Sequence, residues 1–104
     1  MKQKKYKLRY LPLFEQDLTD TAEYIAITLQ NPSAADDLID QVETAILKRL
    51  NYPEAFEAYP SVKNRPFPYY RIYVKNYVVY YVVIDDVMEV RRLIHKSREA
   101  EKLI

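Results

Sequence analysis

Three runs rich in tyrosine, valine and isoleucine occupy the chain from residue 69 to residue 94, with about two residues between one run and the next. The runs are Tyr69–Lys75, Tyr77–Ile84 and Val87–Ile94. Their side chains suit a pleated, half-buried surface, so each run predicts a strand. Connections this short join antiparallel neighbours, and the Asn and Asp residues in them tolerate the positive φ of tight turns. The pattern therefore predicts an antiparallel meander.

Two segments with helical periodicity precede the meander. Apolar residues recur at helical spacing over residues 14–29 and again over residues 35–50. Between them, Asn31 can cap the first free amides of a helix, and Pro32 suits the first helical position. Because the connection is brief, we expect the two helices to form an antiparallel hairpin.

A short strand is expected at the start of the chain, over Tyr6–Tyr10, where apolar and basic side chains alternate before Pro12. Residues 54–68 hold three prolines and no periodicity, which predicts an ordered but irregular connection. The predicted fold is one α+β domain over residues 1–104: an N-terminal strand, an antiparallel helical hairpin, and a three-stranded antiparallel meander packed against the helices. Whether the first strand lies at an edge or in the centre of the sheet is open.

The composition excludes several kinds of site. The chain has no cysteine, one histidine (His95) and no glycine. Disulfides and thiolate metal sites are therefore impossible, and we expect no metal, no cofactor and no glycine-rich phosphate loop. Neither a membrane-spanning apolar run nor an export signal is apparent, so we expect a cytoplasmic protein.

Charge is unevenly distributed along the chain, although the formal net charge is only +1. Residues 10–57 hold ten acidic and two basic side chains, whereas residues 58–98 hold eight basic and three acidic ones. The first nine residues add five basic groups, Lys2 among them, and no acid. Such segregation predicts faces of opposite potential, one of which suits an anionic partner.

The first strand of the meander has one basic and aromatic face. Alternation places Arg71, Tyr73 and Lys75 on one side, and Tyr70, Ile72 and Val74 on the other. A surface of this kind could bind nucleic acid, but a solvated sheet face covered by long side chains would look the same. Both interpretations stay open.

The order of elements and several motifs resemble the RelE/ParE superfamily, the toxins of type II toxin–antitoxin systems, also called plasmid stabilisation proteins. The segments that carry the resemblance are Pro12–Ile27, Ala34–Pro53, Arg71–Asp86 and Val90–Arg98. Together they span most of the chain from Tyr6 to Arg98, and they are nearer to ParE-like members.

The resemblance implies a toxin that arrests growth and is neutralised by a cognate antitoxin. ParE-like members inhibit DNA gyrase, whereas RelE-like members cut messenger RNA on the ribosome without a metal. A non-toxic binding module of the same fold is a third reading. Both a homodimer and a toxin–antitoxin hetero-oligomer are open. The antitoxin could cover the groove of the helices, the first strand or the basic sheet face.

The candidate catalytic residues come from the RelE-like alternative. Arg71 stands where that subfamily has a functional lysine, and Arg98 matches a functional arginine. His95 would be the acid/base, because it is the only side chain that ordinarily titrates near neutral pH. It could equally end the last strand and hydrogen-bond to backbone. In contrast, Val78 and Ile104 stand where a catalytic arginine and tyrosine are expected, which favours the ParE-like reading.

A second group of residues is expected to bind the target or nucleic acid. Its members are basic or aromatic side chains of the meander and the segment after it: Tyr73, Lys75, Arg91, Arg92 and Lys96. Arginine and lysine would hold phosphate or carboxylate groups, and Tyr73 or Tyr77 could stack on a base. Among the eleven tyrosines, Tyr80 or Tyr81 is expected in the core.

Overall fold

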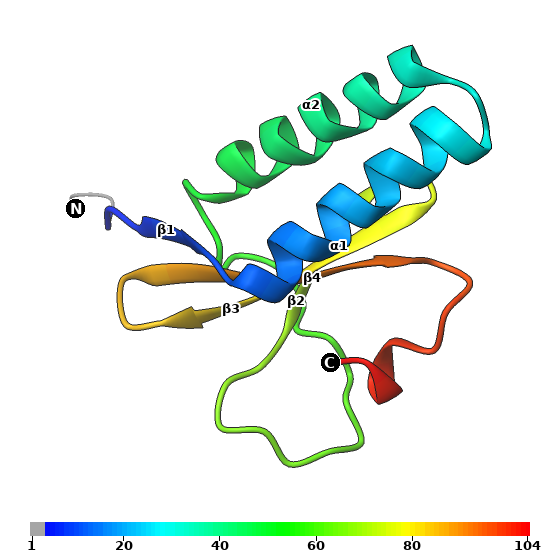
Figure 1. Cartoon of the computed structure of the whole chain (residues 1–104). Coiled ribbons are helices and arrows are strands. Elements are labelled where there is room, and N and C mark those ends of the chain that lie inside the picture. Colours follow the sequence, from blue (N-terminus) through cyan, green and yellow to red (C-terminus); the bar gives the residue numbers. More distant parts are fainter. Residues whose placement is uncertain (1–3) are drawn as a thin grey trace.

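A computed structural model describes residues 4–104, so Lys2 lies outside the described part of the chain. The elements are β1 (Lys7–Tyr10), α1 (Pro12–Glu23), the π-helical turn η1 (Tyr24–Thr28), α2 (Pro32–Arg49), β2 (Tyr70–Val74), β3 (Tyr77–Ile84), β4 (Val87–His95) and the 3-10 turn η2 (Ala100–Lys102). Both long helices lie on one face of a four-stranded sheet (Figure 1). The predicted α+β architecture is confirmed. None of the helices in residues 4–104 has the length and apolar character to cross a membrane.

The sheet has the strand order β1-β4-β3-β2. As predicted, β2, β3 and β4 form an antiparallel meander, with two-residue turns between them. The first strand is an edge strand and runs parallel to β4, which it accompanies only from Val87 to Val90. The helical hairpin makes this pairing possible, since a parallel neighbour needs a long crossover connection.

In only one of the two tight turns does the expected type of residue take the positive φ. Asp85 has a φ of 56°, as expected for an Asp in such a turn. In the other turn Lys75, and not Asn76, takes the positive φ, of 53°. The backbone position therefore holds a side chain that does not favour it, because only Gly, Asn and Asp visit this region at low cost.

The helical hairpin is confirmed, with a local difference at its tip. The side chain of Asn31 accepts a hydrogen bond from the Ala34 amide at 3.2 Å, as expected for a helix cap. The predicted first helix does not remain α-helical to Leu29. It ends at Glu23, and the Leu29 amide then donates to the Tyr24 carbonyl, five residues back. This wider turn moves the apolar residues that follow out of the α-helical stripe.

The core lies on both faces of the sheet. Under the helices, the buried side chains of α1 and α2 pack on buried side chains of the sheet. The helices contribute Phe14, Leu38, Val42 and Ile46, and the strands contribute Ile72, Val79, Tyr81, Met88 and Val90. On the far face a smaller cluster contains Tyr69, Val78, Tyr80, Val82, Ile94 and Ala100. Tyr80 and Tyr81 are thus both buried, on opposite faces. The irregular segment 54–69 and the C-terminal residues border this second cluster, as Tyr59, Leu103 and Ile104 pack against it.

Candidate functional site

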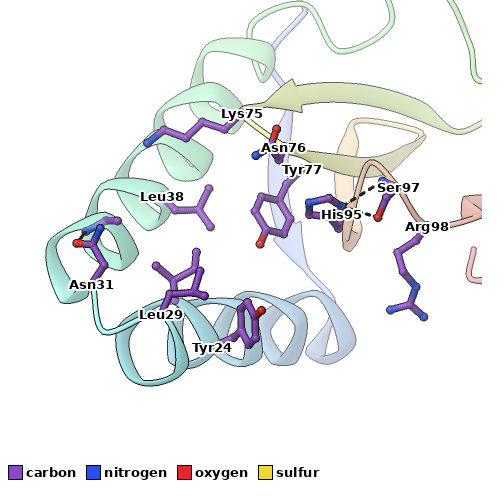
Figure 2. A pocket seen from close by; sticks show the side chains of 12 residues that line it. Tyr24, Leu29, Asn31, Leu38, Lys75, Asn76, Tyr77, His95, Ser97 and Arg98 are labelled. Atoms are coloured by element: carbon purple, nitrogen blue, oxygen red, sulfur yellow. Dashed lines mark hydrogen bonds between the residues drawn. The ribbon is translucent and has the colours of Figure 1, made fainter.

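An open groove of about 840 Å³ lies between the tip of the helical hairpin and the end of the sheet (Figure 2). Its lining consists of Tyr24, Ile25, Leu29, Asn31, Ala34, Leu38, Lys75, Asn76, Tyr77, His95, Ser97 and Arg98. The helical hairpin supplies a mainly apolar wall, whereas the β2–β3 turn and the end of β4 supply the polar side. Among the predicted site residues, the groove brings together Lys75, His95 and Arg98.

The π-helical turn shapes the apolar wall. Tyr24 and Leu29, at and just beyond the ends of η1, are 51% and 55% exposed although both line the groove. Turns of this kind are rare and occur frequently at functional sites. Large apolar side chains that the fold itself does not bury therefore border this groove.

His95 sits at the end of β4 in a defined orientation. Its Nδ1 accepts a hydrogen bond from the Ser97 amide at 3.1 Å and lies 2.7 Å from the Ser97 hydroxyl. Because Nδ1 accepts the amide proton, the neutral ring carries its own proton on Nε2. The ring also meets Tyr77 edge-on, with centroids 5.2 Å apart. Burial raises the pKa of the Tyr77 phenol, with a smaller contribution from Tyr24, so this hydroxyl stays protonated at neutral pH.

Lys75 and Arg98 form the basic rim of the groove. Both side chains are exposed, and no ion pair within residues 4–104 involves either of them. Lys96 is an exposed neighbour whose amide donates to the Asn76 carbonyl at 2.8 Å. This bond ties the end of β4 to the β2–β3 turn and fixes the two sides of the rim relative to one another.

Arg71 lies on the other side of the sheet from His95. Arg71 is opposite Tyr80, whose ring belongs to the far-face cluster, whereas His95 is opposite Tyr77, which packs under the helices. Since directly opposed residues share a face of a sheet, the two side chains point to opposite faces. The guanidinium of Arg71 stacks instead on Tyr59, 5.1 Å from its ring centroid.

Tyr73 also lies outside the groove that contains His95. Its side chain is 65% exposed, next to Arg71, and it borders a shallow depression with α2. Lys75 lines this depression as well as the groove, so it connects the two surfaces. The exposed basic and aromatic face predicted for this strand is present, and its opposite side is buried.

Arg91 forms an ion pair within the fold. Its Nε donates to Glu89 at 2.7 Å, and Glu89 also binds Arg9 at 2.6 Å. Burial alone would raise the pKa of the Glu89 carboxyl, but hydrogen bonds from the two arginines outweigh it and hold that pKa below its ordinary value. A second guanidinium nitrogen of Arg91 donates to the Tyr69 hydroxyl at 3.2 Å. The Glu89 side chain is only 7% exposed.

Arg92 also forms an ion pair within the fold. It donates to the Asp17 carboxylate at 2.8 and 3.1 Å and to the Leu103 carbonyl at 2.7 Å. Arg91 and Arg92 thus anchor β4 to its surroundings in the described structure.

The two positions that depart from the RelE-like pattern lie at the far face. Val78 is 3% exposed inside the apolar cluster there, and Ile104 packs against that cluster. Glu101 fastens the C-terminal segment to the long connection by accepting hydrogen bonds from Ser61 and Val62. The surroundings of Val78 are therefore apolar and partly covered by the chain's own end.

Sequence reasoning missed the helical side of the groove. Leu38 was expected only as part of a core stripe, and Tyr24 and Leu29 only as part of the first helix. Asn31 was expected as a helix cap, which it is, but it also lines the groove. No local pattern marks these residues as neighbours of His95, because the contact arises only when the hairpin packs on the sheet.

Residues 8–100 match the family model described as the ParE toxin of the type II toxin–antitoxin system parDE. The chain belongs to the ParE toxin family. It thus belongs to the RelE/ParE superfamily that its motifs resemble, and it is the toxin component of a type II toxin–antitoxin system. None of the curated proteins matches the chain.

Solved structures share the ParE-family fold at low sequence identity. A chain of the chromosomal ParDE system from P. aeruginosa is similar with a TM-score of 0.73 and 12% identity, over 88% of this chain and 96% of that one. A chain of the E. coli DinJ–YafQ toxin–antitoxin complex has a TM-score of 0.58 and 9% identity, over 89% and 94%. YafQ from E. coli strain BL21(DE3) has a TM-score of 0.51 and 12% identity, over 88% and 94%.

Proposed function

We propose that this ParE-family toxin arrests growth by acting on DNA gyrase in the cytoplasm, and that a cognate antitoxin neutralises it. The observation that carries the proposal is the position of Arg71 relative to His95. A nuclease of the RelE-like kind would need both groups beside one phosphate. They project from opposite faces of the sheet, which supports a toxin that acts by binding.

The chemistry of RNA cleavage explains why this separation matters. A general base has to reach the 2′-hydroxyl within about 3 Å, and a cation has to neutralise the phosphorane charge at a similar distance. Two groups on opposite faces of a sheet cannot serve one reacting atom. The surroundings of Val78 add support, since this buried residue packs within the apolar cluster of the far face.

Messenger RNA cleavage is the second candidate, because His95 and Arg98 do share one groove. In that case the groove, and not the far face of the sheet, would hold the phosphate. His95, with its Nδ1 held by Ser97, would serve as the acid/base through Nε2, and Arg98 would stabilise charge. Loss of cleavage in His95→Ala and Arg98→Ala would then be expected.

One set of experiments separates the candidates. The chain is expressed from an inducible promoter, growth and DNA-damage induction are followed, and messenger RNA 5′ ends are mapped. Purified protein is then added to gyrase supercoiling and DNA-cleavage assays. We expect growth arrest, inhibited or poisoned gyrase, and intact messages. New codon-positioned 5′ ends that vanish in His95→Ala would contradict the proposal, and harmless expression would support a non-toxic binding module instead.

A further inference from the structure

Arginine and tyrosine side chains gather across the far face of the sheet. Arg9 of β1 stands at one edge of this face, where it binds Glu89, and Arg71 of β2 stands at the other edge. Neighbouring strands are about 4.8 Å apart, so the distance from β1 across β4 and β3 to β2 is about 14 Å. The set is called the arginine–tyrosine row and contains Arg9, Arg91, Tyr69, Arg65, Tyr59, Arg71 and Tyr73.

Contacts with tyrosine rings hold the arginines of the row in place. A guanidinium nitrogen of Arg91 donates to the Tyr69 hydroxyl at 3.2 Å. The Arg71 guanidinium lies 5.1 Å from the centroid of the Tyr59 ring and 5.8 Å from that of the Tyr73 ring. A guanidinium stacked on a ring keeps its N–H donors at its edge, where they can reach a phosphate. Because the side chain is already positioned, less conformational freedom is lost when an anion binds.

The row holds more positive charge than the fold neutralises. Arg9 and Arg91 share one carboxylate, that of Glu89, at 2.6 and 2.7 Å. Arg65 lies 3.8 Å from a second carboxylate. Among residues 4–104, Arg71 takes part in no ion pair. Four arginines thus meet two carboxylates, and the excess of positive charge suits an anionic ligand.

The exposed side chains of the row favour a nucleic-acid strand as this ligand. Tyr73 is 65% exposed and the Arg9 side chain 51%, whereas the aliphatic Val78 and Ile94 of the same face are buried. Solvent therefore reaches aromatic rings and guanidinium groups together. Proteins that bind single strands combine these two features, because cations attract the phosphates and every base can stack on an aromatic ring.

We propose that the arginine–tyrosine row binds a single strand of DNA, with one phosphate at Arg71, another at Arg9 and Arg91, and an unpaired base stacked on Tyr73. The inference rests on the proposed action on DNA gyrase and adds a direct contact between the toxin and the DNA. A row of about 14 Å accommodates more than one phosphate, since phosphates of one strand are spaced by about 3.4 Å along a duplex. A single strand is favoured over a duplex because paired bases stack on one another and leave no free face for Tyr73.

The test measures binding of a fluorescently labelled oligo-dT of about 15 nucleotides by fluorescence polarisation, at salt concentrations from about 50 to about 200 mM. Arg71→Ala, Arg9→Ala and Tyr73→Ala are compared with wild type. Lys5→Ala is the matched control for charge, because Lys5 is exposed and borders the C-terminal end of α2. Tyr52→Ala is the control for an aromatic ring, at a side chain that is 59% exposed outside the row.

We expect Lys5→Ala and Tyr52→Ala to bind the strand as wild type does. Arg71→Ala and Arg9→Ala should each lose about fivefold in affinity at about 0.1 M salt, and the slope of log K against log salt should become shallower by about 0.7, because one phosphate fewer is neutralised. Tyr73→Ala should lose about fivefold or more with an unchanged slope, since its ring contributes stacking and no charge. Circular dichroism melting of each variant separates lost binding from lost folding.

Three outcomes would overturn the inference. The first is no binding of the strand by wild type, or unchanged affinity in Arg71→Ala and Tyr73→Ala. The second is a loss of affinity in Arg71→Ala with the salt slope of wild type, which would show that this guanidinium meets no phosphate. The third is an RNA strand of the same length that binds more than about tenfold tighter than the DNA, which would assign the face to RNA.

Gyrase supercoiling is assayed separately with the wild-type toxin, so the two proposals fail in distinguishable ways. Inhibition of gyrase without binding of the DNA strand refutes the role of the row alone. Binding of the strand without inhibition refutes the gyrase proposal alone.

Discussion

Asp17 of α1 binds Arg92 of β4 and also accepts a hydrogen bond from the backbone of that strand. Its carboxylate accepts two hydrogen bonds from Arg92, at 2.8 and 3.1 Å, and a third from the Leu93 amide at 3.0 Å. Because β1 accompanies β4 only as far as Val90, the side of β4 away from β3 has no strand beside it beyond that point within residues 4–104. An exposed edge with free amides invites pairing with another chain. Asp17 satisfies one of these amides and so connects the first helix to the last strand.

Replacing Asp17 should therefore destabilise the fold. In Asp17→Asn the Arg92 side chain, which is 18% exposed, loses its countercharge. We expect the free energy of unfolding to fall by about 2 kcal/mol, because hydrogen bonds to a charged group stabilise a fold by about 1.5–3 kcal/mol. Urea denaturation measures it. The control is Asp20→Asn, the same change at an exposed position of the same helix, which should cost less than about 0.5 kcal/mol. Equal midpoints for the two variants would contradict the role of Asp17.

Glu89 should make stability depend on pH. Its pKa is lower in the folded chain than in the unfolded chain, so its contribution is present above the unfolded pKa and is lost as the pH falls through the folded pKa. We expect Glu89→Gln to cost about 2 kcal/mol at neutral pH, because Arg9 and Arg91 lose a nearly buried partner. The difference from wild type should shrink as the pH falls from about 5 to about 3.

Thermal unfolding followed over this pH range checks the Glu89 prediction. Glu57→Gln is the matched control, since Glu57 is exposed. A difference between Glu89→Gln and wild type that stays constant with pH would show that the ionised carboxylate is not the stabilising species.

The hydroxyl of Tyr81 should contribute more to stability than that of any exposed tyrosine. Tyr81 is fully buried, donates to the Pro53 carbonyl at 2.7 Å and accepts from Arg49 at 3.0 Å. Tyr81→Phe removes the donor to the buried Pro53 carbonyl and one acceptor of Arg49, which still donates to the Arg71 carbonyl, and it should cost about 1–3 kcal/mol. Tyr73→Phe, at a side chain that is 65% exposed, should be nearly neutral. Denaturant unfolding of the pair is the measurement, and similar losses in both would refute the assignment.

A substitution at Lys75 should stabilise the β2–β3 turn. With its φ of 53°, Lys75 occupies a region that Asn tolerates better. Lys75→Asn should raise the free energy of unfolding by about 0.5–1 kcal/mol, because the left-handed region costs most side chains about 1–2 kcal/mol and Asn less. Lys96→Asn, at an exposed residue outside the positive-φ positions, is the control for stability. A Lys75→Asn variant less stable than wild type would show that the lysine side chain supports the turn.

Most of the fold was predictable because its signals are local. The aromatic and β-branched runs, the Asn31 cap and the two-residue turns each depend on a few neighbouring residues. The three-strand meander and the helical hairpin were predicted on this basis and are present. The candidate site was harder, because Arg71 and His95 belong to strands whose facing directions depend on register, including the shift between Tyr80 and Tyr81.

The sequence alone determined which elements form and in what order, since periodicity, caps and turns act over a few residues. Three features were decided only by the tertiary structure. They are the parallel edge position of β1, the pairing of Arg91 and Arg92 with Glu89 and Asp17, and the meeting of the hairpin tip with Lys75 and Arg98. Each joins residues far apart in the chain, and contacts of that kind exist only after the helices have packed on the sheet.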